Sequence, residues 1–162
     1  MGERASKGRT AVERRSEREL VVTRIFDAPV RLVFDAWTKP ELFKLWWAPK
    51  SMGVPLLSCE MDVRTGGGYR IAFGHDAADS MAFFGKYLEV SPPSRLVWTN
   101  DEGGGAVTTV TFEEKDGGTL LVLQELYPST EALDEAFLGM EDAMPEQFEQ
   151  LDDLLATLRA SV

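Results

Sequence analysis

The residues best suited to acid–base, nucleophilic or metal chemistry are few in this chain. It has one histidine, His75, and one cysteine, Cys59. A zinc site built on this pair would need further carboxylate ligands brought in by the fold. A Ser–His–Asp or Cys–His arrangement would have to use His75, and no nucleophile-elbow motif accompanies it. We therefore expect no metal, no cofactor and no nucleophilic catalysis.

Two carboxylates, Glu60 and Asp62, stand two positions apart in a run typical of a β-strand. They would share one face of that strand, which is the geometry of a pair that could exchange protons with a substrate. Cys59, Met61 and Val63 occupy the alternate positions and form the apolar face. The sequence therefore favours a solvent-facing role for the two acids.

The glycine runs at 66–68 and 103–105 do not form a phosphate-binding loop. Neither completes a GxGxxG or GxxxxGK[ST] motif, and neither leads into a helix whose N-terminus could hold a phosphate. Both runs are expected to be turns between strands.

The elements that would position these residues follow from their spacing. Apolar residues after Pro29 and after Pro40 predict two short helices. Alternating apolar residues, separated by glycine-rich or proline-marked turns, predict seven antiparallel strands. We place these strands at 20–26, 57–63, 68–74, 81–90, 95–100, 106–114 and 119–127.

The C-terminal segment has the period of an amphipathic helix that covers the sheet. Its apolar residues recur at steps of three or four: Leu133, Phe137, Met140, Met144, Phe148, Leu151, Leu155 and Leu158. Because a proline inside a helix removes a hydrogen bond, Pro145 predicts a break. We expect a short helix near 130–138 and a long helix that begins close to Pro145.

Composition and charge restrict the partners of the protein. The net charge is −10, and residues 1–19 are the only basic stretch. We predict a disordered basic tail at 1–18 and a single domain at 19–162. An acidic body repels phosphate backbones, so neither nucleic acid nor a membrane is the expected partner. No apolar run suits a membrane span or a secretory signal, so we expect a cytoplasmic protein.

The apolar inventory is rich in large side chains, with six methionines, nine phenylalanines and four tryptophans. These side chains could fill a solid core, or they could line a cavity in which flexible thioethers adapt to a guest molecule. Composition alone favours the solid core.

Several strings of the sequence resemble one family over residues 19–160. They are VVTRIFDAPVRLVFDAWTKPELFKLWW, DVRTGGGYRI, GKYLEVSPPSRLVWT, KDGGT and GMEDAMPEQFEQLDDLLATL. They resemble the START-like (SRPBCC) helix-grip superfamily, in the branch named after the C-terminal domain of the Hsp90 ATPase activator Aha1. The resemblance implies an α+β fold of the order β-α-α-β6-α. In that fold a curved seven-stranded antiparallel sheet grips a long C-terminal helix.

The resemblance also implies an apolar cavity between the sheet and the helix, which favours the cavity over the solid core. Similar proteins often carry Gly-Trp where this chain has Ala143-Met144. Matching positions place the following ligand-binding candidates at the cavity: Trp37, Trp46, Trp47, Met61, Tyr69, Phe73, Phe83, Trp98, Met140, Met144 and Phe148. Gln124 and Glu125 are the polar candidates on the last strand, and the period does not decide which of them faces inward.

Three functions stay open at this point. The favoured one is a binding module that encloses a small hydrophobic or amphipathic molecule. The alternatives are a cyclase-like or hydrolytic enzyme that uses the same cavity, with a buried Glu125 as acid or base, and an Hsp90-type co-chaperone. An Hsp90-type chaperone is not the expected partner, because the chain has no room for the second domain that the eukaryotic activator uses. The sequence does not fix the ligand, and it leaves a homodimer open.

Overall fold

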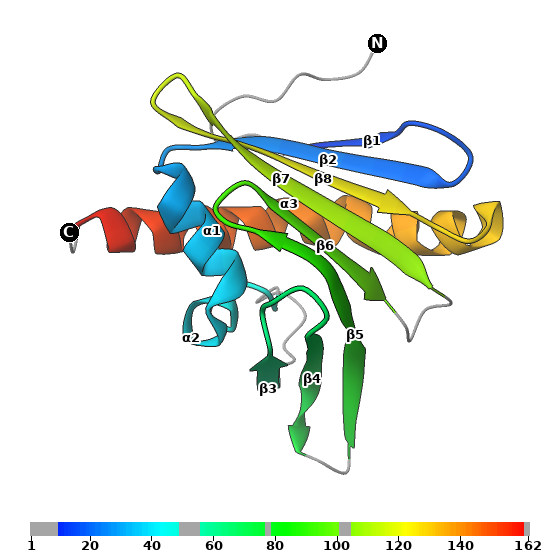
Figure 1. Ribbon diagram of the computed structural model, residues 1–162. Helices are drawn as coiled ribbons and strands as arrows, with labels where there is room; N and C mark the ends of the chain where they lie inside the picture. Colours follow the sequence, from blue (N-terminus) through cyan, green and yellow to red (C-terminus); the bar gives the residue numbers. More distant parts are fainter. Residues whose placement is uncertain (1–9, 49–55, 77–78, 101–104, 161–162) are drawn as a thin grey trace.

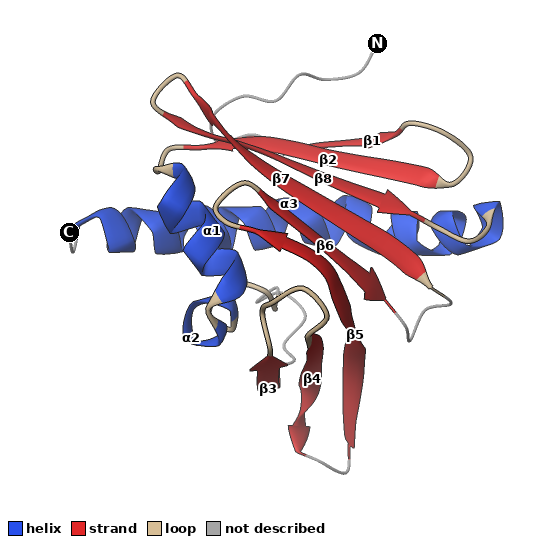
Figure 2. Ribbon diagram, viewed as in Figure 1, coloured by secondary structure: helices blue, strands red, loops and turns tan. Residues whose placement is uncertain are grey.

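The computed structural model of the protein describes residues 10–48, 56–76, 79–100 and 105–160. Figures 1 and 2 show a curved antiparallel sheet with a long helix lying across one face. The helices are α1 (Val30–Thr38), α2 (Pro40–Phe43) and α3 (Thr130–Ala160). The strands are β1 (Ala11–Arg14), β2 (Glu19–Phe26), β3 (Leu56–Met61), β4 (Gly68–Asp76), β5 (Asp79–Ser91), β6 (Arg95–Asn100), β7 (Ala106–Lys115) and β8 (Gly118–Leu126).

The strand order is β1-β2-β8-β7-β6-β5-β4-β3, and every neighbouring pair is antiparallel. Strands β3 to β8 follow one another as hairpins, whereas β2 pairs with β8 from the far end of the chain. This arrangement confirms the predicted α+β helix-grip fold. The first long strand, β2, and the last strand, β8, therefore lie side by side in the sheet.

The sheet has eight strands in the described part of the chain, where the sequence predicted seven. The additional strand, β1, lies inside the segment 1–18 that was expected to be disordered. It pairs with β2 through Ala11 opposite Thr23, and Ala11 is buried. Arg14 of β1 also forms an ion pair of 2.7 Å with Asp134 of α3. A four-residue strand whose only apolar residues are the adjacent Ala11 and Val12 shows no alternation to recognise in the sequence.

The C-terminal helix is one continuous helix, so the predicted break near Pro145 is wrong. Pro145 lies inside α3, where its ring removes one backbone donor. Packing offsets this loss, because the helix buries four large side chains against the sheet and α1, namely Leu133, Phe148, Leu151 and Leu155. A proline costs about 3 kcal/mol in a helix interior, and each fully buried apolar side chain contributes roughly 1.5–3 kcal/mol.

Strand β5 is long enough to bend from one half of the sheet to the other. Its first part pairs with β4, and the later part, from Tyr87 onward, pairs with β6. Gly85 lies at this bend, where a Cβ atom would clash with the backbone carbonyl of Thr99. Glycine is therefore required for the close approach of the two strands. The bend curves the sheet around the space in front of α3.

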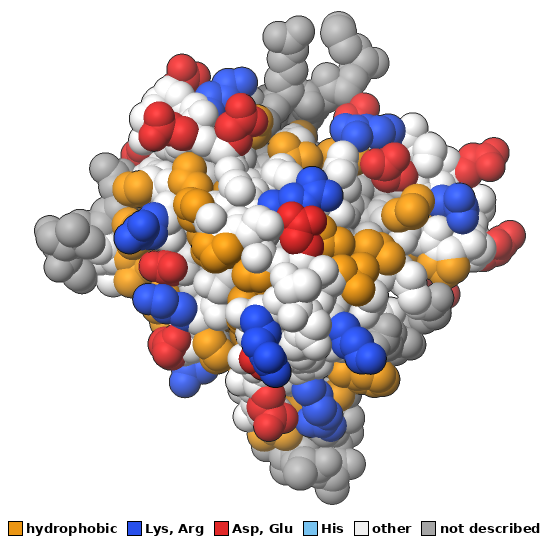
Figure 3. All heavy atoms as spheres, viewed as in Figure 1, with side chains coloured by type: hydrophobic (Ala, Val, Ile, Leu, Met, Phe, Trp, Pro, Cys, Tyr) orange, Lys and Arg blue, Asp and Glu red, His pale blue; other side chains and the backbone are white. Residues whose placement is uncertain are grey.

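The outer face of the sheet, shown in Figure 3, carries basic, acidic and scattered apolar side chains. Phe84 and Leu88 of β5 are among the exposed apolar residues, at 45% and 50% relative accessibility. Single exposed apolar side chains are ordinary on a protein surface. No helix of the described residues has the length and apolar character needed to cross a membrane.

Candidate functional site

A cavity of about 460 Å³ lies between the concave face of the sheet and α3. Side chains from α1, α2, α3 and strands β3 to β8 border it, so every layer of the fold contributes to the wall. Its lining residues are Trp37, Phe43, Trp47, Met61, Tyr69, Ile71, Phe83, Tyr87, Trp98, Asn100, Ala106, Leu123, Glu125, Tyr127, Ala132, Glu135, Met144 and Gln147.

One end of the cavity is walled by aromatic rings. Trp37 of α1 has its ring centroid 6.0 Å from that of Trp47 and 5.9 Å from that of Trp98. Tyr87 continues the wall, 6.4 Å from Trp98 and 5.7 Å from Tyr69. Edge-to-face and tilted contacts of this kind stabilise aromatic clusters beyond the area that they bury. We call these five residues the aromatic end.

Two glutamines of α3 fix the segment that carries Trp47. Gln147 donates its side-chain N–H to the carbonyl of Trp47, and Gln150 donates to the carbonyls of Trp46 and Ala48 at 2.9 Å each. Because α2 ends at Phe43, these carbonyls have left the helical ladder and need other donors. The hydrogen bonds attach the aromatic end to the gripped helix.

The opposite end of the cavity is polar and is built around Glu125 of β8. The Glu125 carboxylate accepts hydrogen bonds from the hydroxyl of Thr108, at 2.7 Å, and from the phenol of Tyr127, at 2.5 Å. Asn100 donates from Nδ2 to the Thr108 oxygen at 2.9 Å. The Thr108 hydroxyl therefore uses its own proton for Glu125. We call Asn100, Thr108, Glu125 and Tyr127 the polar end.

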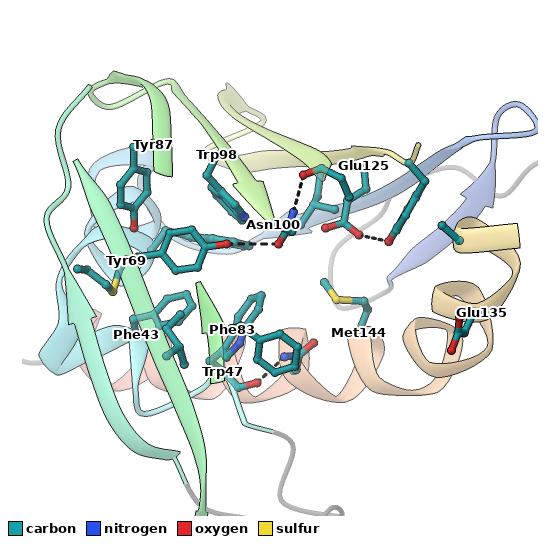
Figure 4. A pocket seen from close by; sticks show the side chains of 18 residues that line it. Phe43, Trp47, Tyr69, Phe83, Tyr87, Trp98, Asn100, Glu125, Glu135 and Met144 are labelled. Atoms are coloured by element: carbon teal, nitrogen blue, oxygen red, sulfur yellow. Dashed lines mark hydrogen bonds between the residues drawn. The ribbon is translucent and has the colours of Figure 1, made fainter. Parts of the chain in front are cut away.

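Tyr69 belongs to the aromatic end, and its phenol also contacts the polar end. Its phenol donates to the carbonyl of Thr99 at 2.7 Å and lies 3.4 Å from Oδ1 of Asn100. Figure 4 shows Asn100 between Tyr69 and Glu125, with Tyr87 and Trp98 on the aromatic side and Met144 across the cavity. The wall thus changes from aromatic to hydrogen-bonding along its length.

Burial shifts the pKa values of three groups near the cavity. Burial raises the pKa of Tyr127, and the charge of Glu125 together with its hydrogen bond raises it further. Burial also raises the pKa of the Tyr87 phenol, with a smaller contribution from Cys59. The pKa of the Cys59 thiol is raised to about 11 by burial. All three groups therefore keep their protons at neutral pH.

Seven of the predicted ligand-binding residues border the cavity: Trp37, Trp47, Met61, Tyr69, Phe83, Trp98 and Met144. Three others lie elsewhere. Trp46 and Phe148 are fully buried in the core, and Phe73 packs on Phe83 with ring centroids 5.5 Å apart. The side chain of Met140 is outside the described residues.

The structure answers which polar residue of β8 faces inward. Leu123 and Glu125 both border the cavity, whereas Gln124 between them does not. Side chains alternate between the two faces of a strand, so Gln124 points to the outer face and drops out as a cavity residue. The alternation of buried Leu121 and Leu123 carries this information in the sequence.

Several lining residues were missed by the sequence analysis. They are Phe43, Ile71, Tyr87, Asn100, Ala106, Leu123, Tyr127, Ala132, Glu135 and Gln147. Tyr87 had a signal that could have found it, because it lies on the Gly85 face of β5 at an even spacing from Phe83. Asn100 and Tyr127 stand at strand ends, where alternation gives no assignment.

One buried donor of a residue in the wall has no partner in the described part of the chain. The indole Nε1 of Trp37 is without a hydrogen bond among the described residues, although Trp37 is only 1% exposed. Trp46 offers a direct contrast, since its Nε1 donates to the carbonyl of Ala36 at 2.9 Å. Buried donors nearly always have a partner, so the indole N–H of Trp37 is an exception among the described residues.

Of the residues first considered for chemistry, Cys59, Glu60 and Asp62 do not border the cavity. Glu60 is exposed, and Asp62 forms a salt bridge of 2.8 Å with Arg64. The Cys59 thiol lies 3.4 Å from the sulfur of Met61. In the described ranges, no three His, Cys, Asp or Glu side chains come together as metal ligands would. The side chain of His75 is outside the described residues.

Solved structures of similar proteins share the fold. A protein from Rhodobacter sphaeroides is 25% identical, with a TM-score of 0.85 over 93% of this chain and 99% of that one. A protein from Staphylococcus epidermidis is 27% identical, with a TM-score of 0.74 over 90% and 93% of the two chains. An AHSA1-like protein from Aeromonas hydrophila is 18% identical and shares the fold, with a TM-score of 0.72 over 83% and 92%. No curated protein matches the sequence.

The family model described as activator of Hsp90 ATPase homolog 1-like protein matches residues 27–156. This range contains α1, α2, strands β3 to β8 and most of α3. It therefore contains all eighteen residues that border the cavity. The chain belongs to the AHSA1-like family of the START-like (SRPBCC) superfamily.

Proposed function

We propose that the protein binds a small hydrophobic or amphipathic molecule in the cavity between the sheet and α3. The observation that carries the proposal is one partly open cavity with an aromatic end and a polar end. Small-molecule sites combine a mostly apolar wall with a few placed polar groups, and they usually span about 300–1,000 Å³. A cavity of about 460 Å³ falls within that range.

The chemistry of the wall supports an amphipathic ligand. The aromatic end offers ring faces and edges but few hydrogen-bonding atoms, so it suits an apolar body. Glu125 at the other end is held by two hydroxyl donors and would orient a polar group of the ligand. Met144 lines the space between the two ends, where a flexible thioether can adapt to different shapes.

Filling the cavity from the Met144 position tests this function. We expect the wild type to bind Nile red, a neutral apolar dye, with a rise in its fluorescence. Met144→Trp should weaken dye binding at least tenfold, because the indole would occupy the space, while the melting temperature holds or rises. Met144→Leu is the matched control and should keep binding, since it adds no ring.

The same experiment can overturn the proposal. A close-packed interior would lose about 1–3 kcal/mol when a tryptophan is forced into it, and the wild type would bind no dye. A wild type that leaves Nile red unchanged, together with a destabilised Met144→Trp variant, would show that the cavity is not open in solution.

A catalytic function is a second candidate, and Glu125 is the observation that favours it. A carboxylate inside a cavity, hydrogen-bonded to a phenol, could transfer a proton to or from a bound molecule, as in a cyclase-like or hydrolytic reaction. Mass spectrometry distinguishes the two functions. A binding protein returns its ligand unchanged in mass and in chromatographic position after prolonged incubation, whereas an enzyme returns a product.

A further inference from the structure

We infer that the ligand is an apolar amine, whose protonated nitrogen lies beside Glu125 while its body fills the aromatic end. This inference rests on the proposed function and adds the chemical class of the ligand. It depends on three features of the cavity: the sign of its charges, the orientation of the Glu125 carboxylate and the aromatic character of the wall.

The described residues that border the cavity include two acids, Glu125 and Glu135, and no lysine, arginine or histidine. Glu125 is partly buried, and Glu135 is exposed on α3. Figure 4 places both on the same side of the cavity, away from Trp98 and Tyr87. Two carboxylates with no cationic side chain among the described lining residues favour a positive group on this side and repel an ionised carboxylate.

The hydrogen bonds around Glu125 fix the role of its carboxylate as a hydrogen-bond acceptor. Both the Thr108 hydroxyl and the Tyr127 phenol donate to it, and Asn100 in turn donates to Thr108. The network fixes the carboxylate in place and uses it only as an acceptor. An ionised carboxylate that accepts from an ammonium group makes a charge-assisted hydrogen bond, which is about twice as strong as a neutral one.

The aromatic wall is compatible with a cationic head as well as an apolar body. The ring centroids of Trp47 and Trp98 lie 6.0 and 5.9 Å from that of Trp37. Aromatic faces attract cations, so they guide an ammonium group inward without repelling it. The same rings would not compensate for burying a carboxylate headgroup.

A matched series of probes tests the inference. Decylamine, decanol and decanoate share one chain and carry a positive, a neutral and a negative head at neutral pH. Each is used below its micellar concentration to displace Nile red from the wild-type protein. We expect decylamine to bind at least about tenfold more tightly than decanol, and decanoate to bind more weakly than both.

Two variants separate the cavity from the overall acidity of the chain. Glu125→Gln removes the charge with little change in shape and should bring decylamine to within about threefold of decanol. Glu149→Gln removes the same charge from an exposed position of α3 that does not border the cavity, and it should leave the preference unchanged. Melting temperatures show whether Glu125→Gln is folded, and if it is not, the wild-type order of the three probes decides.

The outcomes separate this inference from the proposed function. If decanol displaces Nile red and decylamine binds no more tightly, the cavity binds ligands but does not select amines, and the inference is wrong. If Glu149→Gln lowers the preference as much as Glu125→Gln does, the preference comes from the surface, and the inference is again wrong. If Nile red does not bind at all, the proposed function fails first.

Discussion

The same helix covers a solid region and a hollow region of the molecule. Around Phe148 of α3 the interior is filled, with ring centroids 5.6 Å from Phe26 and 6.2 Å from Trp37. Around Met144, one turn earlier, the interior borders the cavity. Both side chains are nearly inaccessible, at 0% and 3%. Low accessibility of a side chain therefore does not by itself show whether the residue borders the cavity.

The difference arises from what stands between the sheet and α3. In the solid region Trp46, which follows α2, fills the space and packs edge to face on Trp37 and Phe43 at centroid distances of 4.8 and 5.3 Å. Trp37 and Phe43 form the boundary between the two regions, because they also border the cavity. In the hollow region no helix of the described residues lies between α3 and strands β5 to β8. The strands curve at Gly85 and hold the space open.

Truncating a large side chain in each region should give the largest contrast. Phe148→Ala removes a ring that is packed on all sides, and we expect a loss of about 3–5 kcal/mol in the free energy of unfolding. Met144→Ala only enlarges a space that already exists, so its loss should be about 2 kcal/mol or less. Urea denaturation measures both values.

Equal losses in these two variants would contradict the comparison. They would mean that Met144 packs as closely as Phe148 in solution and that the cavity is closed there. A change in the denaturant slope would instead point to a change in the unfolded state, so slopes are compared before free energies.

The sequence predicted the architecture more reliably than the details of the site. Strand alternation and glycine turns identified seven of the eight strands, because those strands are long. They missed β1, which is four residues long. The rule that proline breaks a helix failed at Pro145, where tertiary packing outweighs one missing hydrogen bond.

Neighbouring residues show why the site was harder to predict. Trp46 and Trp47 follow one another in the sequence, yet Trp46 is core and Trp47 borders the cavity. Both positions lie just beyond the four-residue α2, where no helical period applies. The cavity itself depends on how layers distant in sequence meet. For that reason the family resemblance, and not composition, suggested the cavity.

Raising the pH should lower the free energy of unfolding through one tyrosine at each end of the cavity. We expect this effect to be smaller than that of Phe148→Ala. The pKa values of Tyr87 and Tyr127 are raised in the folded protein above their ordinary value of about 10. Their contribution to stability is complete below that value and is lost as the pH rises above it. Each group should lower the free energy of unfolding by about 1.4 kcal/mol per pH unit there.

Single substitutions assign this alkaline loss to the two ends. We would measure urea denaturation between pH 8 and about 11 in a Cys59→Ser background, because the thiol pKa of about 11 would otherwise contribute. Tyr127→Phe and Tyr87→Phe should each make the decline shallower. If neither does so, the phenols are not the groups that oppose ionisation in the folded state.

The smallest expected effect separates two tryptophans within the aromatic cluster. Trp37 and Trp46 are both at most 1% exposed, and their ring centroids are 4.8 Å apart. Replacing either by phenylalanine removes similar apolar area. Trp46→Phe also leaves the carbonyl of Ala36 without its donor, whereas Trp37→Phe removes a donor that has no partner among the described residues. We therefore expect Trp46→Phe to be less stable than Trp37→Phe by about 1 kcal/mol, in the absence of any ligand.

The difference in stability between the two variants isolates the hydrogen bond of the Trp46 indole. Since the shared loss of apolar area cancels in the comparison, the remaining difference reports the two indole N–H groups. Thermal and urea denaturation of the purified, ligand-free variants would measure it. Equal stability of the two variants would mean that the N–H of Trp37 has a partner of its own in the free protein. If Trp37→Phe were the less stable variant, Trp37 would belong to the solid region rather than to the wall of the hollow one.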